Sequence, residues 1–343
     1  MADGATELKS RSVQTPLLVA LTAYAAAAIA LAGCQTDVRL SRALQPLSQQ
    51  MLAQLEQKHM PIDSPILIRL FKEESEVEVW KQDTSGRFAL LKTYPICRWS
   101  GDLGPKTREG DRQAPEGFYT VRPEQMNPNS HHYLSFDIGY PNVYDRAYGR
   151  TGGNIMMHGG CSSAGCYAVA DEQIAEIYAL ARESFYGNQR SFQVQAYPFR
   201  MTPLNLVKHL DNHNMPFWMM LKEGNDHFEV THLEPKIDVC EKRYVFDAKP
   251  VGGVPNGTTR KRWQGNVFAA VTTVVAPSFD PSGWCPAYEI SHEIALAVAQ
   301  KNRRDESEMT ELLSRGTSAL PIQTGRDGAM ETGALTLDGI DVD

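Results

Sequence analysis

The segment from residue 154 to residue 167 constrains the fold of this chain more than any other part of its sequence. An apolar run at residues 155–157 is typical of a strand, which would carry His158 to the end of a sheet. Cys166 follows eight residues later, and glycines allow tight turns between them: Gly159, Gly160 and Gly165. We therefore expect a sheet edge where a short loop brings a cysteine beside a histidine.

A cysteine beside a histidine is an arrangement for nucleophilic catalysis. The thiolate is the attacking form, and an ordinary thiol pKa of about 8.5 leaves only a few per cent of it ionised at neutral pH. A neighbouring imidazole removes the proton, and amide groups of a glycine-rich turn can hold a developing oxyanion. The sequence thus predicts Cys166 as nucleophile, His158 as general base and Gly165 beside the oxyanion.

Other interpretations of this segment involve Cys161. A disulfide between Cys161 and Cys166 would silence the nucleophile, and the two cysteines with His158 are candidate metal ligands. Zinc sites use three or four ligands, and no second cluster with ligand spacing occurs in the sequence, so we expect neither a metal nor a cofactor. Thioredoxin-like chemistry uses two cysteines separated by two residues, whereas four separate these.

The segment resembles the signature of the YkuD-type L,D-transpeptidases, in the short-spaced form of the YafK-like branch. The similarity extends in order over about residues 65–245 and includes five further segments: Cys97 to Lys106, Glu109 to Asp111, Ala114 to Tyr119, Gly139 to Ala147, and Tyr197 to Thr202. The resemblance implies a mainly β fold, a YkuD-like mixed β-sandwich with one packed helix. It also implies a cysteine enzyme that acts on peptidoglycan stem peptides.

The chain departs from the wider family at Ala164, where most members have a second histidine, and in its short spacing. The role of base therefore falls to His158 alone, and the loop that shapes one wall of the acceptor site is abbreviated. The resemblance implies that the Gly159 carbonyl supports His158. Ser163 either orders the loop or is an ordinary exposed serine.

The resemblance further implies three residues that shape the substrate site: Tyr144, Arg146 and Lys106. Arg146 is a candidate partner for a peptide carboxylate, because a guanidinium binds a carboxylate through two hydrogen bonds. A structural ion pair is the alternative role for Arg146 and for Lys106. These three side chains are predicted on the family pattern alone.

The implied reaction is attack of Cys166 on the carbonyl at the L-centre of meso-diaminopimelate, which forms a thioester. An amine acceptor then yields a cross-link or an anchored lipoprotein, whereas water makes the enzyme a hydrolase that detaches a wall-bound lipoprotein. Two other hypotheses remain. A papain-like endopeptidase expects the cysteine before the histidine, and here the order is reversed. A non-catalytic wall-binding lipoprotein would keep the motif for structural reasons.

The N-terminus carries a second signal. Residues 17–34 are uncharged and apolar, and the stretch ends in Leu31-Ala-Gly-Cys34, which resembles a lipobox. We expect residues 1–34 to be a lipoprotein signal peptide, with lipid on Cys34 and a periplasmic enzyme body. Gln35 favours the outer membrane. The stretch is also just long enough to be a signal anchor.

The remaining cysteines fit that compartment, because Cys97, Cys161, Cys240 and Cys285 are an even number suited to two disulfides. Four cysteines allow three pairings. We favour Cys97 with Cys161 and Cys240 with Cys285.

Periodicity divides the rest of the chain. We expect a tether and helix at residues 35–63, a catalytic domain at 64–198, an α/β extension at 199–302 and a disordered tail at 303–343. The expected helix of the catalytic domain runs from Asp171 to Phe185, with Asp171 as its cap and Gly187 at its end. Strand-like runs precede and follow it, and another spans residues 267–275.

Composition excludes two classes of protein. With 42% hydrophobic residues and one long apolar stretch, the chain is not a membrane bundle. The formal charge of −7 and the absence of a basic cluster interleaved with aromatics exclude nucleic acid as a partner. The expected partners are peptidoglycan stem peptides, a wall-linked lipoprotein and a membrane reached through the lipid.

Overall fold

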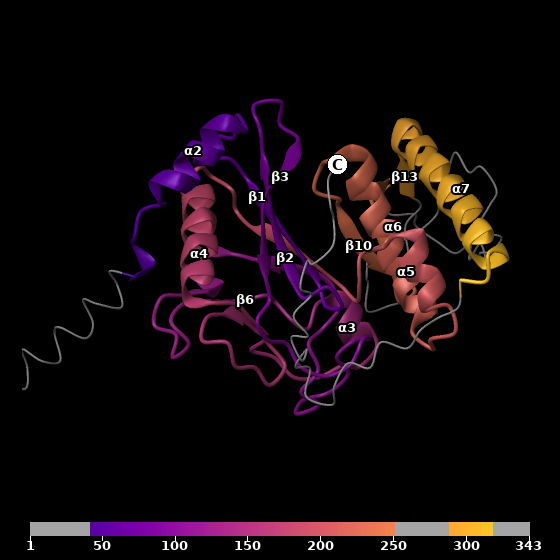
Figure 1. Cartoon of the computed structure of the whole chain (residues 1–343), viewed down its shortest axis with the longest axis horizontal. Coiled ribbons are helices and arrows are strands. Elements are labelled where there is room, and N and C mark those ends of the chain that lie inside the picture. The colour runs from indigo at the N-terminus through magenta and orange to yellow at the C-terminus, as the bar shows by residue number, and fades with distance from the viewer. Residues whose placement is uncertain (1–41, 251–287, 318–343) are drawn as a thin grey trace, which may run out of the picture.

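The main element of the computed structural model, which describes residues 42–250 and 288–317, is a five-stranded mixed sheet (Figure 1). Its order is β3-β2-β1-β9-β4, and only the β1–β9 pair is parallel. The strands are β1 (Ile66–Phe71), β2 (Glu76–Gln82), β3 (Phe88–Pro95), β4 (Gly117–Val121) and β9 (Phe192–Tyr197). The mixed β architecture expected from the sequence is confirmed.

Strand β1 is buried along its whole length because both faces of the sheet are covered. Ile66, Ile68 and Leu70 share a hydrophobic cluster with the helix α4 (Asp171–Tyr186), whereas Leu67 packs near Phe228 of the helix α6 (Met215–Thr231). Figure 1 shows α4 on one side of the sheet and α6 on the other. The packed helix that was expected is α4, and α6 is a second cover that the sequence did not predict.

A smaller sheet carries the candidate catalytic segment. Its order is β5-β6-β7-β8, with β5 (Met126–Asn127), β6 (Ser135–Asp137), β7 (Met156–His158) and β8 (Tyr167–Ala168). Helix α4 follows β8 directly and ends at Gly187, as predicted. Its N-cap is Ala170 rather than the predicted Asp171, because the Asp171 carboxylate is used to bind the catalytic loop instead.

Short helices flank these sheets. Helix α2 (Gln49–Gln57) lies within the tether and helix expected at residues 35–63. The Ser48 hydroxyl caps it by accepting from the Met51 amide at 3.1 Å. The 3₁₀ turn η1 (Pro123–Gln125) and helix α3 (Val143–Ala147) complete the N-terminal half. None of the helices in the two described ranges is long and apolar enough to cross a bilayer.

The chain beyond β9 packs against the same sheet. It forms α5 (Pro203–Lys208), α6, β10 (Ile237–Cys240), β11 (Arg243–Phe246), β12 (Ala248–Pro250), β13 (Tyr288–Ile290) and α7 (His292–Ser314). Trp218 and Leu221 of α6 join Phe71 and Phe118 of the sheet in one buried cluster. The predicted boundary between residues 198 and 199 therefore separates residues that share a core.

Helix α7 corrects the expectation of disorder from residue 303, because the helix continues to Ser314. Its polar residues form ion pairs with α6: Lys222 Nζ lies 2.6 Å from Asp305 Oδ2, and Lys301 Nζ lies 3.2 Å from Asp226 Oδ1. These ion pairs help to stabilise a helix whose polar composition is typical of a disordered segment. The strand expected at 267–275 and the tail beyond 317 lie outside the described residues.

A buried ammonium connects the sheet to the loop before β4. Lys72 and Glu116 have no exposed side-chain surface, and Lys72 Nζ lies 2.9 Å from Glu116 Oε1. The same nitrogen donates to three loop carbonyls, those of Asp102, Gly104 and Ala114, at 2.7–3.1 Å. The second Glu116 oxygen accepts from Trp218 Nε1 at 2.8 Å. One ion pair therefore joins β1, the loop and α6.

We predict that Lys72→Met destabilises the protein by about 3–5 kcal/mol, because it leaves the Glu116 carboxylate buried without its partner. Urea unfolding followed by circular dichroism measures this loss. The double variant Lys72→Met/Glu116→Gln removes both charges and should recover part of the stability. An unchanged midpoint for Lys72→Met would contradict this description of the interior.

Candidate active site

Parallel pairing of β7 with β8 brings the predicted nucleophile beside the strand that carries the predicted base. Met157 pairs with Tyr167, and His158 pairs with Ala168. The Met156 amide donates to Cys166 Sγ at 3.3 Å, and His158 follows two residues later, on the same face of the strand. The half-buried Cys166 is the free cysteine of the described residues.

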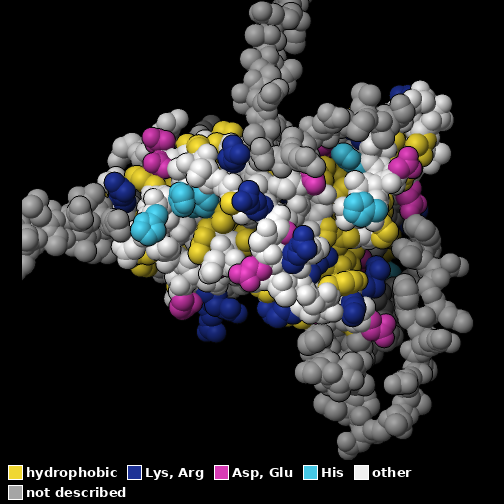
Figure 2. Space-filling model, turned by 90° about the horizontal axis from the view of Figure 1, so that it is seen from below, with side chains coloured by type: hydrophobic (Ala, Val, Ile, Leu, Met, Phe, Trp, Pro, Cys, Tyr) yellow, Lys and Arg dark blue, Asp and Glu magenta, His cyan; other side chains and the backbone are white. Residues whose placement is uncertain are grey.

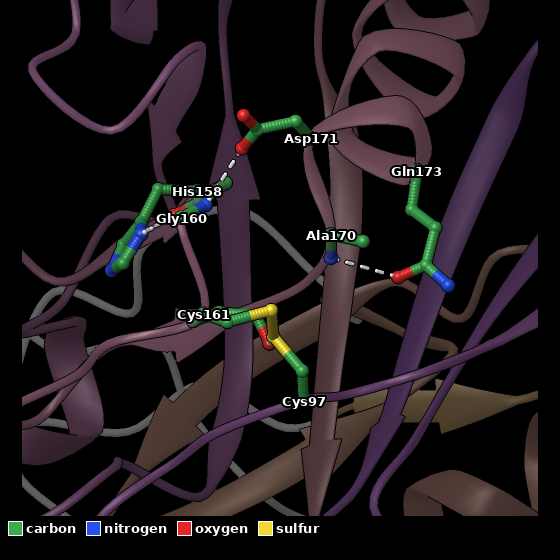
Figure 3. The surroundings of a disulfide bond; sticks show 9 residues. Cys97, His158, Gly160, Cys161, Ala170, Asp171 and Gln173 are labelled. Carbon is green, nitrogen blue, oxygen red and sulfur yellow. Dashed lines mark hydrogen bonds between the residues drawn. A yellow bond between two sulfur atoms is a disulfide. The ribbon is translucent and has the colours of Figure 1, made fainter.

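The buried His158 ring is held in one tautomer. Its Nδ1 lies 2.6 Å from the Gly159 carbonyl oxygen (Figure 3). Because a carbonyl only accepts, Nδ1 carries the proton and Nε2 keeps its lone pair. The Gly159 carbonyl therefore does what the family resemblance implied for it, and the ring is prepared to accept a proton at Nε2.

Helix α4 fixes the loop that follows His158. Asp171 Oδ1 accepts from the Gly160 amide at 2.8 Å (Figure 3). A Cβ atom at Gly159 would lie 2.5 Å from that same oxygen and 3.0 Å from the His132 carbonyl oxygen, so a larger residue would push the Asp171 carboxylate away from the Gly160 amide. Glycine at position 159 therefore leaves room for the Asp171 carboxylate, which the sequence analysis had assigned to a helix cap.

Ser163 holds the nucleophile's own backbone. Its hydroxyl accepts from the Cys166 amide at 2.9 Å and donates to the Cys166 carbonyl at 2.7 Å. Gly165 has a φ of +124°, a conformation that favours glycine. The Cys166 amide is therefore already engaged, and an oxyanion contact from it requires that it exchange or share its bond to Ser163.

A disulfide joins Cys97 to Cys161, with Cα atoms 5.5 Å apart (Figure 3). It confirms the favoured pairing and excludes a bond between Cys161 and Cys166 in this structure. Cys240 is also disulfide-bonded, whereas Cys285, its predicted partner, lies outside the described residues. The catalytic loop is thus tied covalently to the segment after β3.

Burial keeps both reacting groups neutral. It raises the pKa of the Cys166 thiol, which the Met156 hydrogen bond opposes. Burial also lowers the pKa of His158, and the Gly159 carbonyl opposes that shift. At neutral pH the pair is therefore a thiol beside a free imidazole rather than a thiolate–imidazolium ion pair. A nucleophilic role for Cys166 therefore requires that the thiol give up its proton.

The three residues predicted to shape the substrate site lie in different surroundings. Lys106 is buried and paired with Asp111, and its positive charge opposes the rise that burial causes in the pKa of Cys166. Tyr144 is also buried, stacked 4.5 Å from Tyr244, so it does not offer its ring to a ligand. Arg146 is exposed and donates to the Pro141 carbonyl.

Sequence reasoning missed His132, whose ring centroid lies 4.6 Å from that of His158. It lies in the segment before β6, and only the adjacent pair of histidines at 131 and 132 marked it in the sequence. No group of three or more metal-ligating side chains is found within residues 42–250 and 288–317.

Comparisons with known proteins agree on one family. Residues 68–219 match the model of the L,D-transpeptidase catalytic domain, YkuD. The chain is 42% identical to the putative L,D-transpeptidase YafK of Escherichia coli K12 over 196 residues, which are 57% of this chain and 79% of that protein. The protein of the same name in E. coli O157:H7 matches equally.

Solved structures give a weaker match. The helical cell shape determining protein Pgp2 from Campylobacter jejuni is 20% identical, with a TM-score of 0.32 over 44% of this chain and 56% of that one.

We predict that alkylation of Cys166 by iodoacetamide accelerates about tenfold per pH unit between pH 6 and 9, because the raised thiol pKa leaves the thiolate a small fraction throughout that range. Intact-protein mass spectrometry gives the rates, and Cys166→Ser identifies the site. A rate independent of pH below 8 would indicate an ion pair and contradict the neutral assignment.

Proposed function

Because the chain belongs to the YkuD family of L,D-transpeptidases, we propose that it is a cysteine acyltransferase acting on the stem peptides of peptidoglycan. The observation that carries the proposal is the state of the His158 ring. Its bond to the Gly159 carbonyl keeps the proton on Nδ1 and leaves Nε2 free. The same strand contacts Cys166 Sγ through the Met156 amide. This tautomer leaves free the ring nitrogen that a general base uses to accept a proton.

In the first half-reaction Nε2 of His158 takes the thiol proton as Cys166 Sγ attacks the carbonyl at the L-centre of meso-diaminopimelate. The tetrahedral oxyanion collapses, and the C–N bond of the substrate breaks. The leaving amine takes the proton from His158, and the acyl group remains as a thioester on Cys166. The Gly165 and Cys166 peptides are the proposed oxyanion donors, and the Cys166 amide exchanges or shares its bond to Ser163 Oγ when the oxyanion forms.

In the second half-reaction an acceptor attacks the thioester, and His158 removes its proton. The C–S bond then breaks, and the released Cys166 thiolate takes the proton back from His158. An amine from another stem gives a cross-link, and an amine on a protein gives an anchored lipoprotein. Water gives hydrolysis, which would detach a wall-linked lipoprotein. All three outcomes share one thioester, so the chemistry of the first step is common to the leading proposal and to its hydrolytic alternative.

Two basic residues of the family-like segments are assigned separate roles. We assign to Arg146, whose guanidinium is exposed, the binding of a substrate carboxylate. Lys106 has its own carboxylate partner in Asp111, so we assign to it a supporting role: its positive charge favours the Cys166 thiolate.

We also propose that the enzyme body lies in the periplasm and is held at the outer membrane through lipid on Cys34. The Cys97–Cys161 disulfide supports an oxidising compartment, where such bonds persist.

We predict that the soluble form starting after Cys34 changes the muropeptides of sacculi that carry bound lipoprotein, and that Cys166→Ala does not. New stem-to-stem links identify transpeptidation, and loss of lipoprotein-linked stems identifies hydrolytic detachment. Mass spectrometry of the digested sacculi measures both.

Sacculi left unchanged by both forms would count against the enzymatic proposal and favour a wall-binding lipoprotein. Binding to sacculi by a pull-down, with Cys166→Ala binding equally, would then support that alternative.

A further inference from the structure

The His132 ring covers one face of the His158 ring. The two centroids are 4.6 Å apart, and the ring planes are inclined by 30°. His132 is exposed, whereas only 4% of His158 is exposed, so the outer ring lies between the inner one and water. Figure 2 shows that histidine side chains reach the surface on the face seen from below.

The backbone holds the covering residue in place. The His132 carbonyl accepts from the Gly159 amide at 3.1 Å. Gly159 is also the residue whose carbonyl oxygen binds His158 Nδ1. The His132 amide donates to Ser130 Oγ at 3.1 Å. A Cβ atom at Gly160 would lie 3.3 Å from His132 Nδ1, which shows how closely the ring lies over the glycine turn.

We propose that His132 is a positioning residue for the base: it holds the His158 ring against the Gly159 carbonyl and shields it, so that Nε2 stays free for the Cys166 thiol. The hydrogen bond to Nδ1 fixes one edge of the imidazole, and the stacked ring limits its tilt. This inference rests on the proposed function of His158 as general base.

The charge of His132 and the cover that its ring provides both act to lower the pKa of His158. A protonated His132 disfavours a second positive charge on His158 and so helps to lower its pKa, after burial as the larger cause. Other charged groups around the site are Asp171 from α4, bonded to the Gly160 amide, and Asp137 from β6. Lys106 is a third charged group, and Cys166 is a titratable thiol that is neutral here. His132 is the one whose ring contacts His158.

The test is a proton NMR titration of the His158 ring in a Cys166→Ala background, which does not depend on activity. His132→Ala removes both ring cover and charge and should raise the pKa of His158 by about half a pH unit or more. His132→Phe keeps the cover and should give a smaller rise. His131→Phe, at the exposed neighbouring position, is the matched control and should titrate like the background protein.

In parallel, thiol-competent variants are assayed for turnover of a soluble stem peptide. We expect His132→Ala to lower kcat about tenfold with little change in KM. We expect His132→Phe to keep most of the kcat of the unmodified enzyme. The acid limb of the kcat profile should move to higher pH in His132→Ala.

The proposal is overturned if His158 titrates identically in all variants. It is also overturned if an active His132→Ala enzyme keeps its kcat and pH profile. If even the unmodified enzyme is inactive on the peptide, the proposed function fails, and the titration still decides the role of His132.

Discussion

The site depends on the interactions of the buried Lys72 ammonium. It gathers three carbonyls of the loop before β4 and the Glu116 carboxylate at one point beneath the sheet. The same loop reaches the nucleophile, because Tyr167, the residue after Cys166, donates its hydroxyl to the Pro115 carbonyl at 2.6 Å. Removing a fully buried charge from this network would leave its partner unsatisfied, so the geometry around Cys166 is coupled to the interior.

A carbonyl in the place of a carboxylate determines how the base works. The Gly159 oxygen fixes the tautomer of His158 without adding a negative charge that would stabilise the imidazolium. Burial therefore keeps His158 unprotonated and Cys166 as a thiol, the state from which the proposed attack starts. A neutral thiol is also less open to oxidation than a thiolate, which suits a free cysteine five residues from the disulfide-bonded Cys161.

The sequence predicted what depends on local pattern. Apolar runs predicted the mixed β architecture, and the spacing of His158 and Cys166 predicted a loop that brings the cysteine to the strand of the histidine. Features that depend on distant contacts were missed. Tyr144 lies in a motif-like segment, yet its ring is buried against Tyr244, about a hundred residues later in the chain.

The part of helix α7 beyond residue 302 was misjudged for a similar reason. Its residues are mostly polar, and distant contacts make it part of the folded body: ion pairs with α6 and the packing of Met309 against the cluster that contains Trp218. The role of Asp171 was missed because a carboxylate at a helix start is normally a cap, whereas here it accepts from the Gly160 amide. Each of these side chains has a partner that local periodicity does not reveal.

The central claim is that Cys166 forms a thioester with a stem peptide. Rapid-quench mass spectrometry of the intact protein, mixed with a soluble stem peptide containing meso-diaminopimelate, tests it most directly. The account predicts a transient mass increase equal to the acyl fragment, mapped to Cys166, absent in Cys166→Ala and much slower to form in His158→Ala. Peptide turnover with no adduct on Cys166, or turnover that persists in Cys166→Ala, would contradict it.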